Sequence, residues 1–588
     1  MSDKHVVILG AGPAGLAAAH ELVKLGVSPL VLEQSDKVGG IARTETYKGY
    51  YFDIGGHRFF TKIELINRLW QEMMCGEFLK VSRLSRIYYQ GRFFNYPLNI
   101  RNTLSNLGIS ESLLLLMSYC KAQVSPFPEE ETFEQWVANR FGRRLYETFF
   151  KTYTEKVWGI PCDKIQADWA AQRIKGLSLI SAVSNALLGT KTSKSLIDEF
   201  DYPRLGPGML WQRLQDHMEA AGGKVILNTE ALTLHHEKGR ITSVAYREGG
   251  EIREVSAEQF ISSIPITILV ARLEPKAPVE VLEAASSLSY RAFIIVVLII
   301  DKEQLFPDQW IYVHSQEVMV GRIQNFKNWS AAMVPDSGKT SIGMEYFCNA
   351  EDPFWLKTDA ELSEIASREL SLLGLAHTGD VIDSFVVRQP YAYPVYDSDY
   401  SRHLSVIRDF IDGFGNLQTI GRSGMHRYNN MDHSMMTGIL AAQNVMGTRH
   451  NLWGINEESE YLEEGRGTGT EETAQERVLL RTFARMDKLA CATAVGTTTG
   501  LVFFLATLWL VIKGGDVVGP HLRLLSQYFV GYTVTVRGSF IAFGYSFFWG
   551  FLSGWLFAYI RNLFLALYIY RIKKKTELLS LGDFFDHV

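Results

Sequence analysis

The sequence contains little cysteine and has no strong excess of charge. Only five of its 588 residues are cysteines, and no two of them form a C-x-x-C pair. Scattered cysteines predict neither a disulfide framework nor a metal site, and they favour a reduced cytoplasmic setting. The formal net charge of −5 is small for this length, so a nucleic-acid partner is not indicated. The first apolar run lacks the basic flank and cleavage site of a secretory signal.

The chain opens with the pattern of a dinucleotide-binding βαβ unit. An apolar run at residues 6–9 predicts a buried strand, a helical segment covers residues 14–25, and a second apolar run covers residues 29–32. Glycines at G-x-G-x-x-G spacing and a final acid complete the pattern: Gly10, Gly12, Gly15 and Glu33. The first glycine permits a tight turn, the second lets the backbone approach a pyrophosphate, and the third lets helix and strand pack closely. The acid can accept hydrogen bonds from a ribose, and the helix N-terminus attracts the phosphates.

Two further motifs select the cofactor. Residues 37–44 read K-V-G-G-I-A-R-T and resemble the second glycine motif of the FAD-binding amine-oxidase superfamily, which lies along the FAD diphosphate. This resemblance implies FAD rather than NAD, with Gly39, Gly40 and Arg43 beside the cofactor. Residues 51–60 resemble the D-x-G-x-H stretch of the same superfamily. Because glycines permit close backbone approach, Gly56 and His57 are expected against the flavin ring, and His57 is a candidate catalytic residue.

Residues 141–159 narrow the family further. Their sequence, F-G-R-R-L-Y-E-T-F-F-K-T-Y-T-E-K-V-W-G, resembles a run in the helical domain of UDP-galactopyranose mutase, and protoporphyrinogen oxidases share parts of it. In the mutase family a Tyr and a Trp five residues later help to bind uridine diphosphate, and Tyr153 and Trp158 have this spacing. The resemblance also implies phosphate contacts for Arg173 and a catalytic position near the flavin for Arg322. Core aromatics and surface arginines are the alternative interpretations.

The remaining candidates come from three other segments. Residues 345–346 resemble the E-Y strand of the mutase family, which implies that Tyr346 binds substrate, and Tyr202 is a further candidate. A strand, a glycine turn and a helix predicted over residues 433–446 resemble the segment with which the superfamily closes its FAD site. That resemblance implies cofactor contacts for Gly421, Arg422, Met431 and Asp432, and a substrate contact for Tyr428. Asn430 departs from the family, which commonly has Asp there.

These motifs predict a mixed α/β fold with a discontinuous Rossmann-like FAD-binding domain. Residues 1–61, 203–265 and 415–450 are expected to form that domain. A mostly helical region at 62–202 and a β-rich substrate domain at 266–414 are inserted between its parts. A short strand around residues 85–94 is expected to cross the helical region.

The C-terminal part has the composition of a membrane region. An acidic, glycine-rich linker is predicted at residues 454–475, and spans are predicted near 489–512 and 540–562 within a membrane region at 476–588. A buried soluble hairpin is the alternative. Basic residues precede the first span and follow the second, so both termini and the flavin domain are expected on the cytoplasmic side of an inner, multi-pass membrane location. Residues 521–534 are amphipathic and suit the outer interface.

Three hypotheses of function follow. In the first, a mutase-like flavoenzyme acts on a nucleotide-linked or lipid-linked sugar in cell-surface glycan biosynthesis. In the second, an oxidoreductase resembling protoporphyrinogen oxidase or the carotenoid desaturases oxidises an apolar substrate. In the third, a non-catalytic flavoprotein serves membrane partners. Only one dinucleotide fingerprint is present, so an external reductant, NADPH or a redox protein, would have to use the flavin cleft itself. The motifs carry no information on the oligomeric state.

Overall fold

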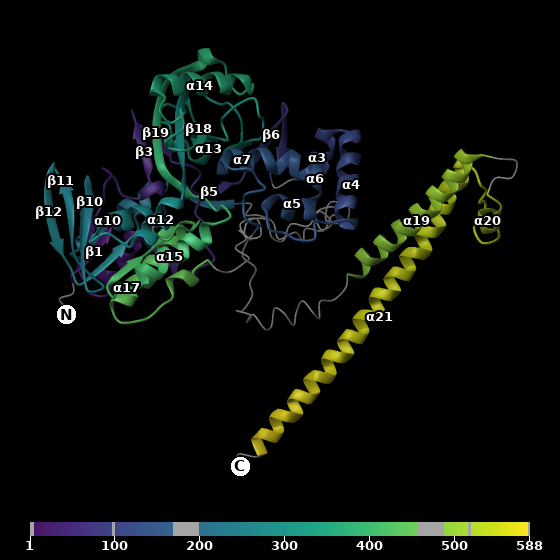
Figure 1. Ribbon diagram of the computed structural model, residues 1–588. Coiled ribbons are helices and arrows are strands. Elements are labelled where there is room, and N and C mark those ends of the chain that lie inside the picture. The colour runs from purple at the N-terminus through teal and green to yellow at the C-terminus, as the bar shows by residue number, and fades with distance from the viewer. Residues whose placement is uncertain (1–4, 97–99, 168–198, 457–486, 515–518, 586–588) are drawn as a thin grey trace. The chain divides into compact units, whose positions relative to one another are not determined.

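The structure is a computed structural model that describes residues 5–96, 100–167, 199–456, 487–514 and 519–585 (Figure 1). The chain divides into two compact units, Met1–Arg466 and Gly467–Val588. Both helices and sheets build the first unit, as the sequence predicts, whereas the second unit is helical.

A five-stranded parallel sheet contains the first strand of the chain at its centre. Its order is β20 (Leu417–Thr419), β13 (Gln259–Ser262), β1 (Val6–Leu9), β2 (Pro29–Leu32) and β9 (Lys224–Ile226). Helix α1 (Pro13–Lys24) packs against α17 (Met431–Val445) and α10 (Gly208–Ala220). Strands from widely separated parts of the sequence therefore lie side by side in one sheet. Parallel pairing aligns their carboxyl ends at a common edge, where α/β proteins bind ligands.

A seven-stranded sheet forms the second layer of the first unit. Its order is β19 (Val381–Pro394), β15 (Tyr290–Ile300), β18 (Thr340–Cys348), β17 (Arg322–Asn325), β16 (Trp310–Val313), β6 (Ser85–Tyr89) and β7 (Arg92–Asn95). Strand β15 is an almost continuous apolar run because its two faces pack into different hydrophobic cores. Helix α14 (Asp359–Leu372) covers one face, as Figure 1 shows at the top of the unit. The other face is turned toward the helical region.

The predicted crossing strand at residues 85–94 is a hairpin, β6–β7, and it belongs to the seven-stranded sheet through pairing of β6 with β16. The helices of the region are α3 (Ile100–Leu107), α4 (Ile109–Val124), α5 (Phe133–Phe141), α6 (Arg143–Tyr146), a π-helical segment (Glu147–Lys151) and α7 (Thr152–Trp158). Helix α2 (Glu64–Met74), which precedes them, packs on α10 and α17 instead. The region is also crossed by β5 (Phe78–Ser82), which pairs with β8 (Glu199–Pro203). Local sequence periodicity indicated a strand but carried no information on its partner.

Two smaller sheets complete the first unit. One has the order β12 (Glu251–Ser256), β11 (Arg240–Glu248), β10 (Thr229–Glu237) and β14 (Leu273–Glu274). The other is the hairpin β3 (Thr44–Tyr47) and β4 (Tyr50–Asp53). In the first of these, β11 and β12 form a hairpin that turns at Gly249-Gly250, and the second sheet leads from the phosphate-binding turns to Gly55, Gly56 and His57.

The second unit is a helical hairpin made of α19 (Lys488–Lys513) and α21 (Val536–Phe585). Both helices are long and apolar enough to cross a membrane, with peak mean hydropathy of 2.0 over Lys488–Lys513 and 1.4 over Val536–Leu563. The described part of the connection contains a short helix, α20 (Pro520–Arg523), and a 3₁₀ turn, Leu524–Gln527, within the predicted amphipathic stretch 521–534. The connection folds back on the hairpin because the Phe529 ring stacks on Tyr545 and the Tyr532 hydroxyl lies 2.9 Å from that of Thr507.

Candidate active site

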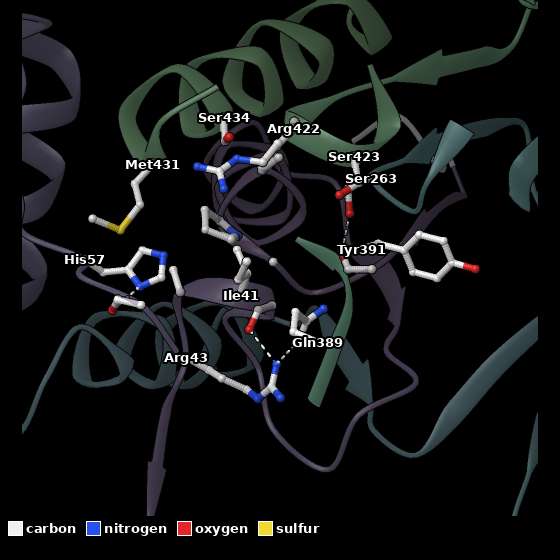
Figure 2. A pocket seen from close by; sticks show the side chains of 18 of the residues that line it. Ile41, Arg43, His57, Ser263, Gln389, Tyr391, Arg422, Ser423, Met431 and Ser434 are labelled. Atoms are coloured by element: carbon white, nitrogen blue, oxygen red, sulfur yellow. Dashed lines mark hydrogen bonds between the residues drawn. The ribbon is translucent and has the colours of Figure 1, made fainter. Parts of the chain in front are cut away.

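A cleft of about 510 Å³ is lined by the carboxyl ends of β1, β2, β13 and β20 and by strands of the seven-stranded sheet (Figure 2). Its lining consists of backbone from the phosphate-binding turns and of side chains from widely separated segments of the chain. Among the predicted site residues that line it are Gly10, Gly12, Glu33, Gly40, Arg43, Gly56, His57, Arg322, Gly421, Arg422, Tyr428 and Met431. The cleft thus brings together residues that are more than 400 positions apart in the chain.

The glycines at the head of the cleft have separate structural roles. Gly10 has a φ of +95°, which favours glycine, and a Cβ on Gly15 would lie 1.9 Å from the Gly10 carbonyl oxygen. Gly15 therefore serves the packing of α1 on the turn and does not line the cleft. A Cβ on Gly12 would meet only the Cα of Gly40, at 3.9 Å, and would otherwise enter the open space of the cleft. This bare backbone beside a helix N-terminus fits the pyrophosphate of a dinucleotide.

Glu33 stands at the end of β2 with a side chain that is 6% exposed. Its carboxylate accepts hydrogen bonds from the backbone N–H groups of Ala11 at 2.7 Å and Ser35 at 2.9 Å. Each carboxylate oxygen has a further lone pair, so the fixed group can still accept from the hydroxyls of a ribose. The carboxylate also ties the end of the second strand to the glycine turn.

The second glycine motif lies beside the first. The Gly39 N–H donates to the Ala11 carbonyl at 2.8 Å, and this bond holds the two turns together although Gly39 itself does not line the cleft. Arg43 donates from Nη1 to the carbonyl of Gly40 at 2.9 Å and to Gln389 at 3.3 Å, as Figure 2 shows. Its Nε is paired with Glu45 at 2.6 Å. The guanidinium therefore adds fixed positive charge to the phosphate side of the cleft.

His57 is neutral at physiological pH. Desolvation and the charges of Arg422 and Arg322 lower its pKa to about 3. Its Nδ1 lies 3.1 Å from the carbonyl oxygen of Gly55, so the proton belongs on Nδ1 and the lone pair on Nε2 is left to face the cleft. The side chain can accept a hydrogen bond from a ligand but cannot supply a positive charge.

The closing segment contributes a helix N-terminus. Helix α17 begins at Met431, two residues before the predicted start, and both Met431 and Ser434 face the cleft (Figure 2). Asp432 does not line the cleft: its carboxylate accepts from the backbone N–H of His433 at 2.8 Å and is 1% exposed. The Arg422 guanidinium lies 4.5 Å from the centre of the Tyr428 ring. Asp432 therefore lies in the first turn of α17 and not at the surface of the cleft.

Arg322 forms the charged centre of the other half of the cleft. It stands opposite Glu345 in the β17–β18 ladder, with Nε 2.5 Å from a carboxylate oxygen of Glu345. Glu345 is fully buried, and Gln324 donates to its second oxygen. Burial raises the pKa of Glu345, while the charge of Arg322 opposes this rise. Arg322 also donates from Nη2 to the Tyr393 hydroxyl at 3.3 Å.

Tyr153 and Trp158 lie behind the aromatic wall of the cleft. Tyr153 stacks on His314 at 5.0 Å and meets the edge of Tyr312, which lines the cleft. Trp158 lies 6.2 Å from the rings of both Tyr393 and Tyr428, which also line it. Both residues are therefore placed to support the wall rather than to form its surface. Arg173 lies outside the described residues.

Two predicted substrate contacts are not supported. The Tyr202 side chain is fully buried, and its hydroxyl donates to Asp53 at 2.5 Å. Tyr346 is 1% exposed and donates to Glu369 at 3.1 Å in the core beneath α14. Successive side chains of a strand point to opposite faces, so Glu345 lies on the face that carries Arg322 and Tyr346 lies on the other face. Tyr346 therefore does not line the cleft.

The structure adds residues that the sequence did not single out. Arg58, Trp310, Tyr312, Trp329 and Tyr393 line the cleft in addition to the predicted set. Trp310 and Tyr312 alternate along β16, and an alternating aromatic pattern is a usable but weak signal. Tyr393 lies near the end of β19, which continues to Pro394, in an aromatic and proline-containing segment of the chain.

The phosphate cradle at the strand ends and the aromatic, arginine-lined half opposite it define a dinucleotide-dependent α/β enzyme. The family profile described as "Flavin containing amine oxidoreductase" matches residues 13–446. The chain belongs to this family, and it is therefore an FAD-dependent flavoenzyme, as the sequence motifs predict.

Individual relatives agree with the family at low identity. A probable UDP-galactopyranose mutase of Klebsiella pneumoniae is 26% identical over 181 residues, 28% of this chain and 44% of that protein. A 15-cis-phytoene desaturase of Synechococcus elongatus is 23% identical over 291 residues, 44% of this chain and 58% of that protein. The chain thus matches less than two thirds of the length of each.

Among solved structures, a reduced UDP-galactopyranose mutase superposes with a TM-score of 0.69 at 20% identity. The superposition covers 79% of this chain and the whole of that one. At this identity the likeness shows the fold, which is the predicted mixed α/β fold of FAD-binding oxidoreductases.

Proposed function

We propose that this flavoenzyme acts on a sugar linked to a nucleotide or to a lipid through a diphosphate, in cell-surface glycan biosynthesis. The cofactor FAD is held in this proposal by the glycine turns, Glu33, Arg43 and the start of α17, and it supplies redox or nucleophilic chemistry at its ring. The chain supplies binding, orientation and charge. The proteins named UDP-galactopyranose mutase to which this chain is similar support the proposed class of substrate.

The observation that carries the proposal is the charge of the cleft lining. Among the described residues it contains six arginines and one carboxylate: Arg43, Arg58, Arg272, Arg322, Arg388, Arg422 and Glu33. Four of the arginines also pair with carboxylates that do not line the cleft, Arg43 with Glu45, Arg272 with Glu230, Arg322 with Glu345 and Arg388 with Asp359. Arg58 and Arg422 lie instead over the rings of Trp310 and Tyr428. Guanidinium groups bind phosphates as planar forks, and aromatic faces stack on bases and sugars. An uncharged polyene would gain nothing from these guanidinium groups.

Arg322 and His57 are the residues that we assign to the reacting centre. Arg322 is held by Glu345 through both Nε and Nη2, and Nη2 also donates to the Tyr393 hydroxyl. These contacts fix the guanidinium plane beside the cleft, where it can contact a phosphate oxygen of the substrate. His57 is kept neutral and can accept a hydrogen bond through Nε2 from a sugar hydroxyl or from the cofactor. Tyr153 and Trp158 orient the tyrosines that would meet the substrate.

We also propose that the second unit anchors the enzyme in a membrane, with both termini on the cytoplasmic side. In the hairpin, small residues meet at the helix contact: a Cβ on Gly496 would come within 2.8 Å of the Phe547 carbonyl oxygen, and one on Gly550 within 3.0 Å of Gly496 Cα. Large apolar side chains such as Trp509 and Phe557 point outward instead. Small residues between the helices and large apolar residues on the outside suit a helix pair surrounded by lipid, and they would be unfavourable in water.

The decisive experiment uses the full chain in detergent or lipid nanodiscs, with its flavin oxidised or reduced by dithionite. Binding of UDP-galactopyranose is measured by calorimetry, and its turnover by product analysis. We expect binding and turnover with the wild type and loss of both in Arg322→Ala, while Arg402→Ala, at an exposed position on α15 (Tyr400–Asp412), retains them. If neither redox state binds a UDP-sugar, and an apolar polyene or porphyrinogen reduces the flavin, the proposal is wrong and the enzyme is an oxidoreductase of apolar substrates.

A further inference from the structure

Helix α4 presents an exposed apolar face that no described part of the first unit covers. Figure 1 shows α4 at the margin of the unit beside α3 and α5, and its contacts are with α3, α5 and α6. One side of the helix packs inward through Leu115. The outward face carries Leu113, Leu114, Leu116, Met117, Cys120 and Val124, all of which are exposed.

The spacing of these residues makes the face continuous. Leu113, Met117, Cys120 and Val124 follow one another at intervals of four, three and four, so they form one line along the helix. Leu114 and Leu116 widen this line on either side. Met117 is 60% exposed and Val124 is 86% exposed. Lys121 lies at the edge of the face, and a lysine can extend past apolar surface to reach phosphate groups.

The size of the face argues against a protein partner. A helix of 16 residues is about 24 Å long, so one face offers a few hundred Å², below the roughly 800 Å² per partner of a stable protein interface. Insertion into a bilayer has no such threshold, because its strength grows with whatever apolar area is buried. The helix is also too short to span a hydrocarbon core of about 30 Å. A position in the plane of the membrane interface fits both limits.

The second unit of the chain would bring the first unit close to a bilayer. The hairpin of α19 and α21 has membrane-length apolar helices, and a covalent connection keeps the first unit at a high effective concentration near whatever membrane holds that hairpin. We propose that α4 is a membrane-docking surface of the flavin unit, whose apolar face inserts at the boundary between lipid head groups and acyl chains. The proposal rests on the membrane anchoring proposed above and adds a second, reversible attachment.

Native cysteines allow a direct test. Cys120 lies on the face and Cys75 is exposed at the end of α2, whereas Cys162 and Cys348 are buried. The full chain is prepared with Cys491→Ala and with either Cys75→Ala or Cys120→Ala, labelled with bimane, and reconstituted in vesicles of phosphatidylcholine and phosphatidylglycerol. Doxyl-labelled lipid then reports contact with the bilayer, and aqueous iodide reports contact with water.

We expect doxyl lipid to quench the label at Cys120 at least twofold more than the label at Cys75, and iodide to show the reverse. Leu113→Gln with Met117→Gln should abolish the lipid quenching at Cys120. A matched pair at exposed leucines elsewhere, Leu356→Gln with Leu372→Gln, should leave it unchanged.

The outcomes separate this proposal from membrane anchoring. If the labelled chain fails to float with the vesicles, both proposals are wrong. If it floats and the Cys120 label is open to iodide but not to doxyl lipid, anchoring stands and docking by α4 is overturned. Protection from both quenchers also overturns the docking, because the face is then covered by protein, either a second copy or another segment of this chain.

Discussion

The two halves of the cleft are built in different ways. The cofactor half uses backbone: the turns at Gly10, Gly12 and Gly40 come from one short stretch at the start of the chain. The substrate half uses side chains from separate strands, with Arg322 on β17 and Tyr393 on β19. A backbone cradle is specified by a local pattern of glycines, whereas a side-chain wall exists only after distant strands have paired.

This difference predicts different responses to mutation. Changes in the cofactor half should act on folding or on FAD retention, because every group there is also a contact between α1, the turns and the sheet. Changes in the substrate half should act on substrate while the flavin stays bound. The four predictions below test that division, from the largest expected effect to the smallest.

Gly15→Val should prevent formation of the folded holoprotein. The new Cβ would lie 1.9 Å from the Gly10 carbonyl oxygen, a backbone atom that no side-chain rotation can move. Such a contact separates α1 from the turn, and we expect a loss above about 5 kcal/mol, beyond the usual cost of overpacking. Soluble yield and the visible flavin spectrum of the purified protein report it.

Gly12→Ala is the matched control. Its Cβ has room against the protein, with the nearest atom at 3.9 Å, but occupies space proposed for the pyrophosphate. The variant should fold with normal far-UV circular dichroism and purify without FAD. Normal FAD content in Gly12→Ala would contradict the proposed placement of the pyrophosphate.

Arg322→Ala should lower the free energy of unfolding by about 3–5 kcal/mol, because it leaves the fully buried Glu345 without its charged partner. Urea denaturation followed by tryptophan fluorescence measures this loss. The flavin spectrum at zero urea should be unchanged, since the glycine turns are untouched.

A double variant separates the effect of the buried charge on stability from the role of Arg322 in substrate binding. Arg322→Met with Glu345→Gln removes both charges and should recover most of the stability, because the amide oxygen introduced by Glu345→Gln can still accept from Gln324. It should not recover binding of UDP-galactopyranose. Recovery of binding without the guanidinium would show that Arg322 supports the fold and does not contact the substrate.

The sequence predicted the cofactor half well because its information is local. One stretch of about 40 residues carried the strands, the helix and the turns, and the structure has them as β1, α1 and β2. The hairpin of membrane-length helices was equally readable, since hydropathy and length are local properties. In each case the residues that act together are neighbours in the chain.

The substrate half was predictable only in part. Resemblance predicts Arg322, which lines the cleft, but the residues do not show which face of a strand meets the cleft, and Tyr346 lies on the face of β18 opposite to that of Glu345, the partner of Arg322. Trp310 and Tyr312 were missed because nothing local to β16 shows that it joins β6 and β17. Prediction from the sequence becomes less accurate as the residues that form a feature lie further apart in the chain.

Asp53→Asn should flatten the dependence of stability on pH. Asp53 is the last residue of β4. Its carboxylate accepts hydrogen bonds from the hydroxyls of Tyr202 and, at 3.0 Å, Thr44. Burial raises its pKa from 3.8 to about 7, against the effect of these two hydrogen bonds. The folded state therefore binds more protons than the unfolded state between about pH 4 and 7. Its stabilising contribution is complete below the unfolded pKa and is lost as pH rises through 7.

The loss amounts to at most about 4 kcal/mol, at 1.36 kcal/mol for each pKa unit. Urea titrations at pH 5, 6, 7 and 8 should show wild-type stability falling with pH and a smaller fall in Asp53→Asn. Parallel curves for the two proteins would mean that Asp53 does not titrate in this range.

Tyr393→Phe should have the smallest effect, because it removes one long hydrogen bond and keeps the ring. The lost bond joins the hydroxyl to Arg322 at 3.3 Å, while the stacking on Tyr428 at 5.7 Å is retained. A hydrogen bond of this kind contributes about 1 kcal/mol, so the free energy of unfolding should fall by about that amount at most. Because Arg322 is then held less firmly, we expect up to about fivefold weaker binding of UDP-galactopyranose by calorimetry, with FAD content unchanged. Tyr391→Phe is the control, because the Tyr391 ring points away from the other labelled residues in Figure 2. If Tyr391→Phe weakens binding and Tyr393→Phe does not, the substrate binds on the Tyr391 side of the cleft. Tyr393 and Arg322 would then not form the substrate half.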